Sequence, residues 1–491
     1  MAISILYLNE RKNSAEPIQG RILYHLSLDR SFSHICADVK KREYFLSVVS
    51  NLTNDQNEIL YRQAVVKDFV NNPALLEQLA TLSARFEELR ITQKTAGRDE
   101  YRLNATGTAS SATAKNILQA QALCLKRALL FIRAYGELLE KYELKSHGLK
   151  SLYSSCKEMY ESPDFIKLIT FCSKYENFSA GGYWDFKFAM NDEGRIESYE
   201  LIDHRYIHVT DPELKKKGFS LFKKAEETAY PCQRLSPDKD GLYERLAVSA
   251  LSDLSGVFAK ISEQIFEKYG LIGRELVFYD VALKYVQTLT EKNVPVCYPT
   301  FTEDQSICVK KLYDLYLLMS SPNSSDVIPN DFMLNKDNGG LLVFGNNGSG
   351  KTVYLRSIGT MQLLAQTGLP IPCESAEITL FSQLATQFSE AEKEFCEGND
   401  AGRFEQEVRE LAAMVDTLKE GSLVFLNETF QSTAYAEGAE GLYHLLKHFS
   451  AFNIRWILVS HLRQLEEMFD NSETAIMYTT EQYKIRKGKS C

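Results

Sequence analysis

The chain has 491 residues, of which 44% are hydrophobic and 25% are charged, as in ordinary globular proteins. A net charge of −9 excludes a chain that is basic throughout, so any contact with nucleic acid must come from a local patch. Its ten cysteines form no CxxC pair, which argues against a metal ion bound by cysteines and for reduced thiols. No stretch reaches the roughly 20 apolar residues of a membrane span, and no signal peptide is visible. We therefore expect a cytoplasmic protein of about three domains without a membrane partner.

Residues 1–30 resist assignment, whereas apolar residues at three- and four-residue spacing predict helices over most of residues 31–295. Asn72 and Pro73 mark a helix boundary, because proline is tolerated in the first turn of a helix. A loop is expected where residues 105–116 read ATGTASSATAKN. Beyond it we predict four long helices, which would act as lever arms, over residues 117–145, 147–175, 241–269 and 272–292.

Two features interrupt this helical region. Residues 183–202 alternate apolar and polar side chains around the turn signal at 191–194, which predicts a small β element. Residues 203–240 are irregular and locally basic, and with the β element they form a candidate clamp region at about 183–240. A solvated face is the ordinary reading of such a charge run, and a phosphate-contacting patch is the alternative. The basic residues are Lys215, Lys216, Lys217, Lys223 and Lys224.

A different pattern begins at residue 296 and continues to 491. Short apolar strands alternate with helices, as in an α/β domain with a mostly parallel sheet. Pro329-Asn330-Asp331 is expected to form a turn. Leu341 to Phe344 then predict a buried strand that runs into Gly345-Asn-Asn-Gly-Ser-Gly-Lys351-Thr352. This segment fits the phosphate-loop pattern GxxxxGK[ST] at every defined position.

That pattern predicts a site for ATP or GTP. Glycines let consecutive backbone N–H groups converge on a phosphate, and the following helix adds its positive end. Lys351 is expected to reach the β and γ phosphates, and the Thr352 hydroxyl to join the Mg²⁺ shell. A chance glycine-rich turn is the alternative reading. The predicted nucleotide-binding residues are Gly345, Asn346, Asn347, Gly348, Ser349, Gly350, Lys351, Thr352 and Val353.

A second apolar strand, Ser422 to Leu426, ends in Asn427 and Glu428. Such a strand usually ends in acidic residues that hold Mg²⁺ and orient the attacking water. Glu428 is the candidate general base, with an ordinary exposed carboxylate as the alternative. Asn427 offers an amide oxygen without charge, so we predict a weakened Mg²⁺ site made by Thr352, Asn427 and Glu428.

A third strand, Trp456 to Ser460, is followed by His461. A side chain at the C-terminal end of a strand in an α/β sheet lies near the ligand crevice, so His461 is a candidate sensor of the γ-phosphate. A buried, hydrogen-bonded histidine without a role in turnover is the alternative. The predicted catalytic residues are therefore Lys351, Glu428 and His461.

In this order the segments resemble the MutS family of DNA-mismatch-repair proteins, within the ABC-type ATPases. VIPNDFML resembles the family's VPND segment, GNNGSGKTVYLR its GPNMGGKSTYLR, and ILVSH its ATH segment. Thr433, Glu437 and Gly438 fall on the family's DEIGRGTSTYDG motif, and YKIRKGKS resembles its YKL-x-x-G-x-S segment. The resemblance is strong over 300–491, moderate over 30–295 and absent before that.

The resemblance implies an α/β ABC-type P-loop ATPase domain at the C-terminus, preceded by a mainly α-helical core and lever domain. It further implies a dimer with composite ATP sites that switches a clamp on DNA. Gly402 stands at the position of the family's signature serine, Asn427 replaces its metal aspartate, and Phe430-Gln431 replace Gly-Arg. We therefore expect slow ATP hydrolysis.

The family's N-terminal mismatch-reading domain has no counterpart in the sequence, so ordinary mismatch reading is not expected. Two functions remain open. One is an ATP-dependent DNA-binding protein, and the other is a nucleotide-gated protein-interaction module with weak or no hydrolysis. Stimulation of ATP hydrolysis by DNA would distinguish them.

Overall fold

The computed structural model describes residues 2–8, 21–106, 110–176, 182–190, 196–206, 242–303, 305–389, 400–430, 435–469, 474–479 and 483–487. Contacts divide the chain into two compact units. Unit 1 comprises residues 1–3, 78–141 and 152–273, and unit 2 comprises residues 4–77, 142–151 and 274–491. Segments on both sides of residue 295 thus belong to unit 2, and the domain limits at 30 and 295 stay predictions.

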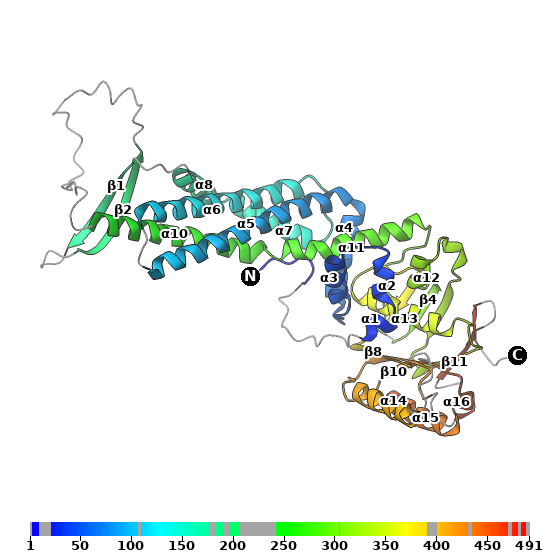
Figure 1. The fold of residues 1–491 in the computed structure, drawn as a ribbon. Helices are drawn as coiled ribbons and strands as arrows, with labels where there is room; N and C mark the ends of the chain where they lie inside the picture. The colour runs from blue at the N-terminus through cyan, green and yellow to red at the C-terminus, as the bar shows by residue number, and fades with distance from the viewer. Residues whose placement is uncertain are drawn as a thin grey trace, which may run out of the picture. The chain divides into compact units, whose positions relative to one another are not determined.

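Long helices dominate unit 1 and run beside one another (Figure 1). Aromatic side chains join them: the Phe86 ring lies 6.1 Å from Tyr135 and 5.0 Å from Phe266, between ring centroids. The buried Tyr135 hydroxyl donates a hydrogen bond to Ser83 Oγ (3.1 Å), so this polar group is satisfied inside the apolar core. The helices of unit 1, two of which begin in unit 2, are α5 (Pro73–Thr106), α6 (Ser111–Leu139), α7 (His147–Tyr160), α8 (Pro163–Glu176) and α10 (Leu242–Tyr269).

Two helix predictions need correction. The helix expected over 117–145 covers Ser111–Leu139 instead, and it begins at Ser111 because Ser110 caps it by accepting a hydrogen bond from the Thr113 amide (3.2 Å). The loop expected over 105–116 is therefore too long, since α5 extends to Thr106 and α6 begins at Ser111. The single helix expected over 147–175 is two helices, α7 and α8, which Pro163 separates. Proline has no amide hydrogen for the helix ladder, so the second helix begins at this residue. The other two helices are confirmed as α10 and α11 (Ile272–Glu291).

The small β element is also confirmed. Strands β1 (Gly182–Met190) and β2 (Ile196–Tyr206) pair antiparallel as a hairpin. The turn predicted at 191–194 and the five lysines predicted as a basic patch lie outside the described residues.

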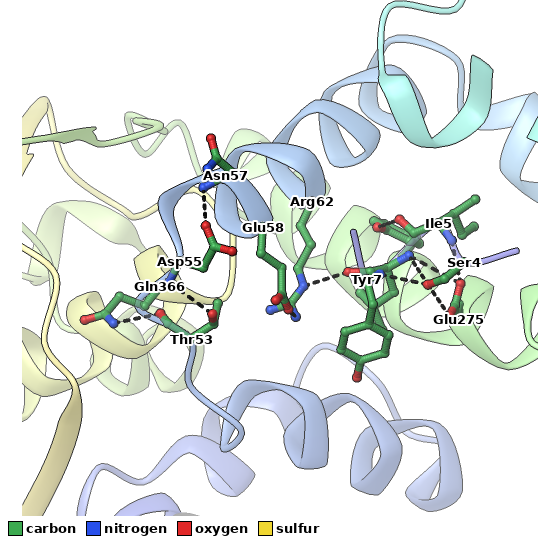
Figure 2. A network of polar contacts seen from close by, with 12 residues as sticks. Ser4, Ile5, Tyr7, Thr53, Asp55, Asn57, Glu58, Arg62, Glu275 and Gln366 are labelled. Atoms are coloured by element: carbon green, nitrogen blue, oxygen red, sulfur yellow. Dashed lines mark hydrogen bonds and ion pairs between the residues drawn. The ribbon is translucent and has the colours of Figure 1, made fainter. Parts of the chain in front are cut away.

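Unit 2 begins with a short N-terminal segment that Figure 2 shows in contact with two helices. Glu275 of α11 accepts hydrogen bonds from Ser4 Oγ (2.6 Å) and from the amide of Ile5 (2.7 Å). Arg62 of α4 (Gln56–Asn71) donates from Nε to the carbonyl oxygen of Leu6 (2.9 Å). The shorter helices nearby are α1 (Arg21–His25), α2 (Leu28–Ser33) and α3 (Val39–Val49). The boundary predicted at Asn72-Pro73 is confirmed, since α4 ends at Asn71 and α5 begins at Pro73.

A six-stranded sheet lies at the centre of the C-terminal part, in the order β12-β11-β6-β10-β9-β8. Its pairs are parallel except for β11 with β12, which confirms the mostly parallel sheet. Gly340 pairs with Trp456, and a Cβ at residue 340 would lie 2.1 Å from the indole ring, so only glycine fits there. The strands are β6 (Gly340–Phe344), β8 (Gln383–Phe388), β9 (Ser422–Asn427), β10 (Arg455–Val459), β11 (Thr474–Thr479) and β12 (Ile485–Lys487).

Helices cover both faces of this sheet, which explains why its strands are apolar runs (Figure 1). Alternate residues such as Leu342, Val424 and Leu458 share one apolar core with the helices below the sheet in this view. On the other face lies α13 (Lys351–Gln366), whose side chains are nearly all buried. The remaining helices are α14 (Asp400–Val415), α15 (Tyr435–Ala451) and α16 (Gln464–Met468).

A second sheet has the order β3-β7-β4-β5. The turn expected at Pro329-Asn330-Asp331 is wrong, because Asn330 and Asp331 begin strand β5, which pairs with β4. This sheet contains β3 (Thr300–Phe301), β4 (Ile307–Leu312), β5 (Asn330–Leu334) and β7 (Ser375–Ile378), with the short helices α12 (Leu315–Ser320) and η1 (Ser324–Asp326). Among the described residues, no helix combines the length and apolar character that crossing a membrane requires.

Candidate nucleotide-binding site

Three neighbouring parallel strands, β6, β10 and β9, end at one edge of the six-stranded sheet. Backbone hydrogen bonds continue past the strands: the Ser460 amide donates to Val343 O (3.2 Å) and the Glu428 amide to Val459 O (2.9 Å). The residues after each strand therefore lie side by side. These are the phosphate loop, Glu428 and His461, which the sequence predicts as parts of one site.

The loop after β6 has the backbone of a phosphate loop. Gly348 and Gly350 have φ of 74° and 91°, in the left-handed region that glycine tolerates best. Gly350 caps α13, whose first helical residue is Lys351. The unpaired amides and the positive end of α13 thus face the loop, as binding of an anionic phosphate requires.

Lys351 lies with its ammonium inside this loop. Its Nζ donates hydrogen bonds to the carbonyl oxygens of Gly345 and Asn346, both at 3.0 Å. Burial lowers the pKa of Lys351, and the Glu428 carboxylate partly opposes that shift. A cation held this way, almost completely removed from water, is placed to neutralise charge on a phosphate.

Thr352 and Asn427 bring two oxygen atoms together. Thr352 Oγ1 lies 3.1 Å from Asn427 Oδ1. Oxygen ligands at adjacent corners of a Mg²⁺ octahedron, each about 2.1 Å from the metal, are about 3.0 Å apart. The hydroxyl and the amide oxygen therefore fit Mg²⁺ that completes its shell with water and phosphate oxygens. They bring no negative charge of their own.

Glu428 has a backbone conformation that is rare for its residue type. Its φ is 57°, in the left-handed region, where a side chain with a Cβ is strained. The turn directs its carboxylate to His461, whose Nε2 lies 3.0 Å from Glu428 Oε1. The His461 side chain is 30% exposed, so it is not a fully buried core histidine.

His461 also lines a polar cavity of about 260 Å³ beside the phosphate loop. Gly345, Asn346, Asn347 and Arg463 contribute to its wall. The histidine and the phosphate loop therefore line the same solvent-accessible cavity, and the Glu428 carboxylate lies next to the histidine.

Several residues near the site have no signal in the sequence. Ser389 Oγ, just after β8, lies 2.9 Å from the carbonyl oxygen of Glu428 and 3.2 Å from Glu407 Oε1. The Ser389 amide donates to Asn427 O (3.1 Å), and Thr429 shares a short hydrogen bond with Gln387. These contacts fix the turn that carries Glu428. They join residues 18 to 42 positions apart, so no local motif could reveal them.

Residues of the C-terminal segment also lie against the loop. Thr479 shares a short hydrogen bond with Ser349, and a Cβ at Gly345 would collide with Thr479. Asn330 Nδ2 donates to Tyr483 O (3.0 Å), and the Ile485 amide donates to Asn330 Oδ1 (2.9 Å). Asn330 thus fixes the backbone beside Tyr483, whose ring lies close to Gly350.

The segments predicted from the family's other motifs are only partly described. Gly402 lies in α14, and Glu437 and Gly438 lie in the first turn of α15. The Phe404 ring lies 5.5 Å from that of Phe430. Thr433 and Gln431 lie outside the described residues.

The region that contains these residues is similar to known proteins. Residues 341–487 match the family model for MutS domain V, and residues 54–292 match the model for the MutS2 N-terminal domain. DNA mismatch repair protein MutS of Rhodopirellula baltica is 23% identical over 436 residues, which cover 84% of this chain and 47% of the relative. MutS of Lactobacillus delbrueckii subsp. bulgaricus is 27% identical over 198 residues, 40% of this chain and 22% of the relative.

A eukaryotic relative, DNA mismatch repair protein MSH3 of Scheffersomyces stipitis, is 25% identical over 236 residues, which cover 48% of this chain and 22% of the relative. The chain spans about half or less of the length of these curated relatives. Family models match both the helical region and the region of the phosphate loop, so the chain belongs to the MutS family.

Proposed function

We propose that this chain is an ATP-dependent DNA-binding protein of the MutS type, which hydrolyses ATP with Mg²⁺ to switch a clamp on DNA. The observation that carries the proposal is the convergence of the phosphate loop, Glu428 and His461 at one sheet edge, with Thr352 Oγ1 only 3.1 Å from Asn427 Oδ1. The C-terminal part would then be an ABC-type P-loop ATPase domain. A cytoplasmic location is part of the proposal.

Each residue has a role in this reaction. Amides from Gly345 to Val353 and the Lys351 ammonium bind the phosphates and neutralise the charge that develops on them. Thr352 and Asn427 would hold Mg²⁺, which would neutralise phosphate charge when bound. Glu428 orients a water molecule and accepts its proton, and His461 fixes the Glu428 carboxylate through their 3.0 Å contact.

Two further parts of the proposal rest on relatives and on the sequence. The chain would form a homodimer, possessing composite sites in which one subunit caps the nucleotide of the other, and nucleotide would favour that dimer. Contacts with DNA would be made chiefly to its phosphates, through lysines of residues 203–240 or the ends of the long helices. Mismatch reading is not part of the proposal.

The test is ATP hydrolysis by the purified chain, without DNA and with duplex, branched or single-stranded DNA. We expect one form of DNA to stimulate turnover. Glu428→Gln should lower kcat by about 10² to 10⁴-fold with ATP binding retained, because a positioned general base contributes that much. Lys351→Ala should weaken ATP binding itself. Turnover that no DNA stimulates would contradict the DNA-dependent activity.

The second candidate is a nucleotide-gated protein-interaction module with weak or no hydrolysis. One observation favours it: Asn427 occupies the metal-side position next to Thr352 without contributing charge, which weakens Mg²⁺ binding. Asn427→Asp separates the two candidates. A large rise in kcat from a near-zero value would support the module, and a small effect on an already DNA-stimulated turnover would support the ATPase.

A further inference from the structure

Two cysteines far apart in the sequence meet within unit 2. Cys297 follows helix α11, and Cys373 follows helix α13, which begins at the phosphate loop. Their backbones are joined through Ile371: the Cys297 amide donates to Ile371 O (3.0 Å), and the Ile371 amide donates to Cys297 O (2.8 Å). The Cys373 amide donates to the same Ile371 oxygen (2.9 Å), in a tight turn that brings Cys373 back beside Cys297.

The two cysteines, which their backbone hydrogen bonds to Ile371 bring together, differ in exposure. Cys297 is partly exposed, whereas Cys373 is completely buried. The hydrogen bond from Cys373 lowers the pKa of Cys297 to about 7 against the opposing effect of burial, and a backbone hydrogen bond at Ala376 adds to the lowering. The same hydrogen bond and burial raise the pKa of Cys373. One thiol is thus accessible and readily ionised, and its partner is sheltered.

We propose that Cys297 and Cys373 form a reversible disulfide in response to hydrogen peroxide. The Cys297 thiolate attacks one peroxide oxygen and the O–O bond breaks, which yields a sulfenic acid on Cys297 and hydroxide that takes up a proton. The Cys373 sulfur then attacks the Cys297 sulfur, the S–O bond breaks, and the departing hydroxide leaves as water with the Cys373 proton. Two thiols are oxidised, one peroxide is reduced, and two waters form.

This bond would connect the segment that follows helix α11 to the segment that follows helix α13. The Tyr285 hydroxyl of α11 already donates to Pro370 O (3.0 Å), three residues before Cys373. A disulfide would add a covalent link between the chain after α11 and the chain after α13. Because such a link restricts the unfolded chain, the oxidised protein should unfold at a higher temperature than the reduced protein.

The experiment treats the full chain with hydrogen peroxide, blocks remaining thiols with N-ethylmaleimide, and identifies joined peptides by mass spectrometry without reduction. We expect a joined pair containing Cys297 and Cys373 that dithiothreitol separates. In Cys373→Ser, Cys297 should stop at the sulfenic acid and react with dimedone. In the wild type, hydrogen peroxide should consume the Cys297 thiol about three times faster than an unperturbed thiol at pH 7, since a larger thiolate fraction outweighs its lower nucleophilicity.

Cys308→Ser is the matched control, because Cys308 is also partly exposed but lies on strand β4. This variant should form the joined pair as the wild type does. In Cys297→Ser, the buried Cys373 should stay reduced. Full recovery of Cys297 and Cys373 as maleimide adducts from peroxide-treated wild type would overturn the proposal. So would equal dimedone labelling of Cys297 in the wild type and in folded Cys373→Ser.

Discussion

At the scale of single residues, the main finding is that Glu428 occupies a strained turn. A residue other than glycine at a φ of 57° persists only when its surroundings fix it. Here the Glu428 amide is bound to Val459 O, its carbonyl oxygen to Ser389 Oγ, and its carboxylate to His461. The strain therefore directs the carboxylate, and removal of a fixing contact should loosen it.

We predict that Ser389→Ala lowers kcat about tenfold and leaves the KM for ATP nearly unchanged. One hydrogen bond of about 1 to 1.5 kcal/mol is lost, and in the proposed mechanism Glu428 acts on the attacking water rather than on nucleotide binding. Steady-state ATP hydrolysis measures both constants. Ser382→Ala is the matched control, because Ser382 Oγ donates to Glu420 O (2.7 Å) at the opposite end of β8. Equal loss in both variants would argue against a positioning role for Ser389.

At the scale of elements, a buried carboxylic acid fastens the N-terminal segment to α11. Glu275 is 3% exposed, and burial raises its pKa from 4.5 to about 7, although hydrogen bonds from Ser4, Ile5 and Leu6 oppose the rise. Arg62, the neighbouring cation in Figure 2, also lowers it. In the folded chain this group therefore keeps its proton at a pH at which the unfolded chain has released it.

A pH dependence follows. Between pH 4.5 and about 7 the folded chain binds more protons at Glu275 than the unfolded chain, so stability falls as the pH rises through this range. The contribution is on the order of 3 kcal/mol and is complete below the unfolded pKa. Glu275→Gln mimics the protonated acid and should remove this part of the pH dependence of thermal unfolding. Glu291→Gln, at an exposed position of the same helix, should leave the dependence intact.

The C-terminal end of α13 is fixed by a second buried network. Gln366 Nε2 donates to Thr53 O and to Phe381 O, both at 2.9 Å, and Gln366 Oε1 accepts from the Phe381 amide (3.1 Å). Figure 2 shows Gln366 directed at Thr53, in the chain before α4. The helix that begins at the phosphate loop is thus held at its far end to the segment that leads into α4.

We predict that Gln366→Met destabilises the protein by about 2 to 4 kcal/mol. Methionine fills a similar volume but leaves the buried backbone groups of Phe381 and the partly buried carbonyl oxygen of Thr53 without their Gln366 partner, and such groups are costly. Chemical denaturation followed by circular dichroism measures the change. Gln56→Met, at an exposed position in the first turn of α4, should cost less than about 0.5 kcal/mol. A loss that small at Gln366 would contradict the prediction.

At the scale of the whole molecule, the acidic net charge of −9 means that the proposed DNA binding would require a local basic patch. Replacement of the five lysines between Lys215 and Lys224 with glutamine should weaken DNA binding. If each lysine contacts one phosphate, the slope of log K against log salt should fall in magnitude by roughly 4.5. Filter binding at several salt concentrations measures it. The control replaces five exposed lysines elsewhere, Lys40, Lys94, Lys150, Lys174 and Lys419.

The sequence predicts local features well and distant ones poorly. Apolar runs located β6, β9 and β10, and the phosphate loop located the start of α13, because those signals lie within a few residues. The break at Pro163 was visible in the sequence, yet periodicity on both sides outweighed it. Asn330 was assigned to a turn from its neighbours, whereas strand pairing decides its conformation. Ser389 and Glu275 act through contacts 39 and 271 residues away, which no local pattern encodes.

The strand order has a consequence for how the chain matures during synthesis. Strand β6 carries the phosphate loop, and its two neighbours, β10 and β11, are made more than a hundred residues later. The growing chain emerges from the ribosome with its N-terminus first, so β6 has both of its neighbouring strands only after Thr479 has left the ribosome. A ribosome that stalls shortly before this point would therefore display a phosphate loop whose strand still lacks its neighbour β11.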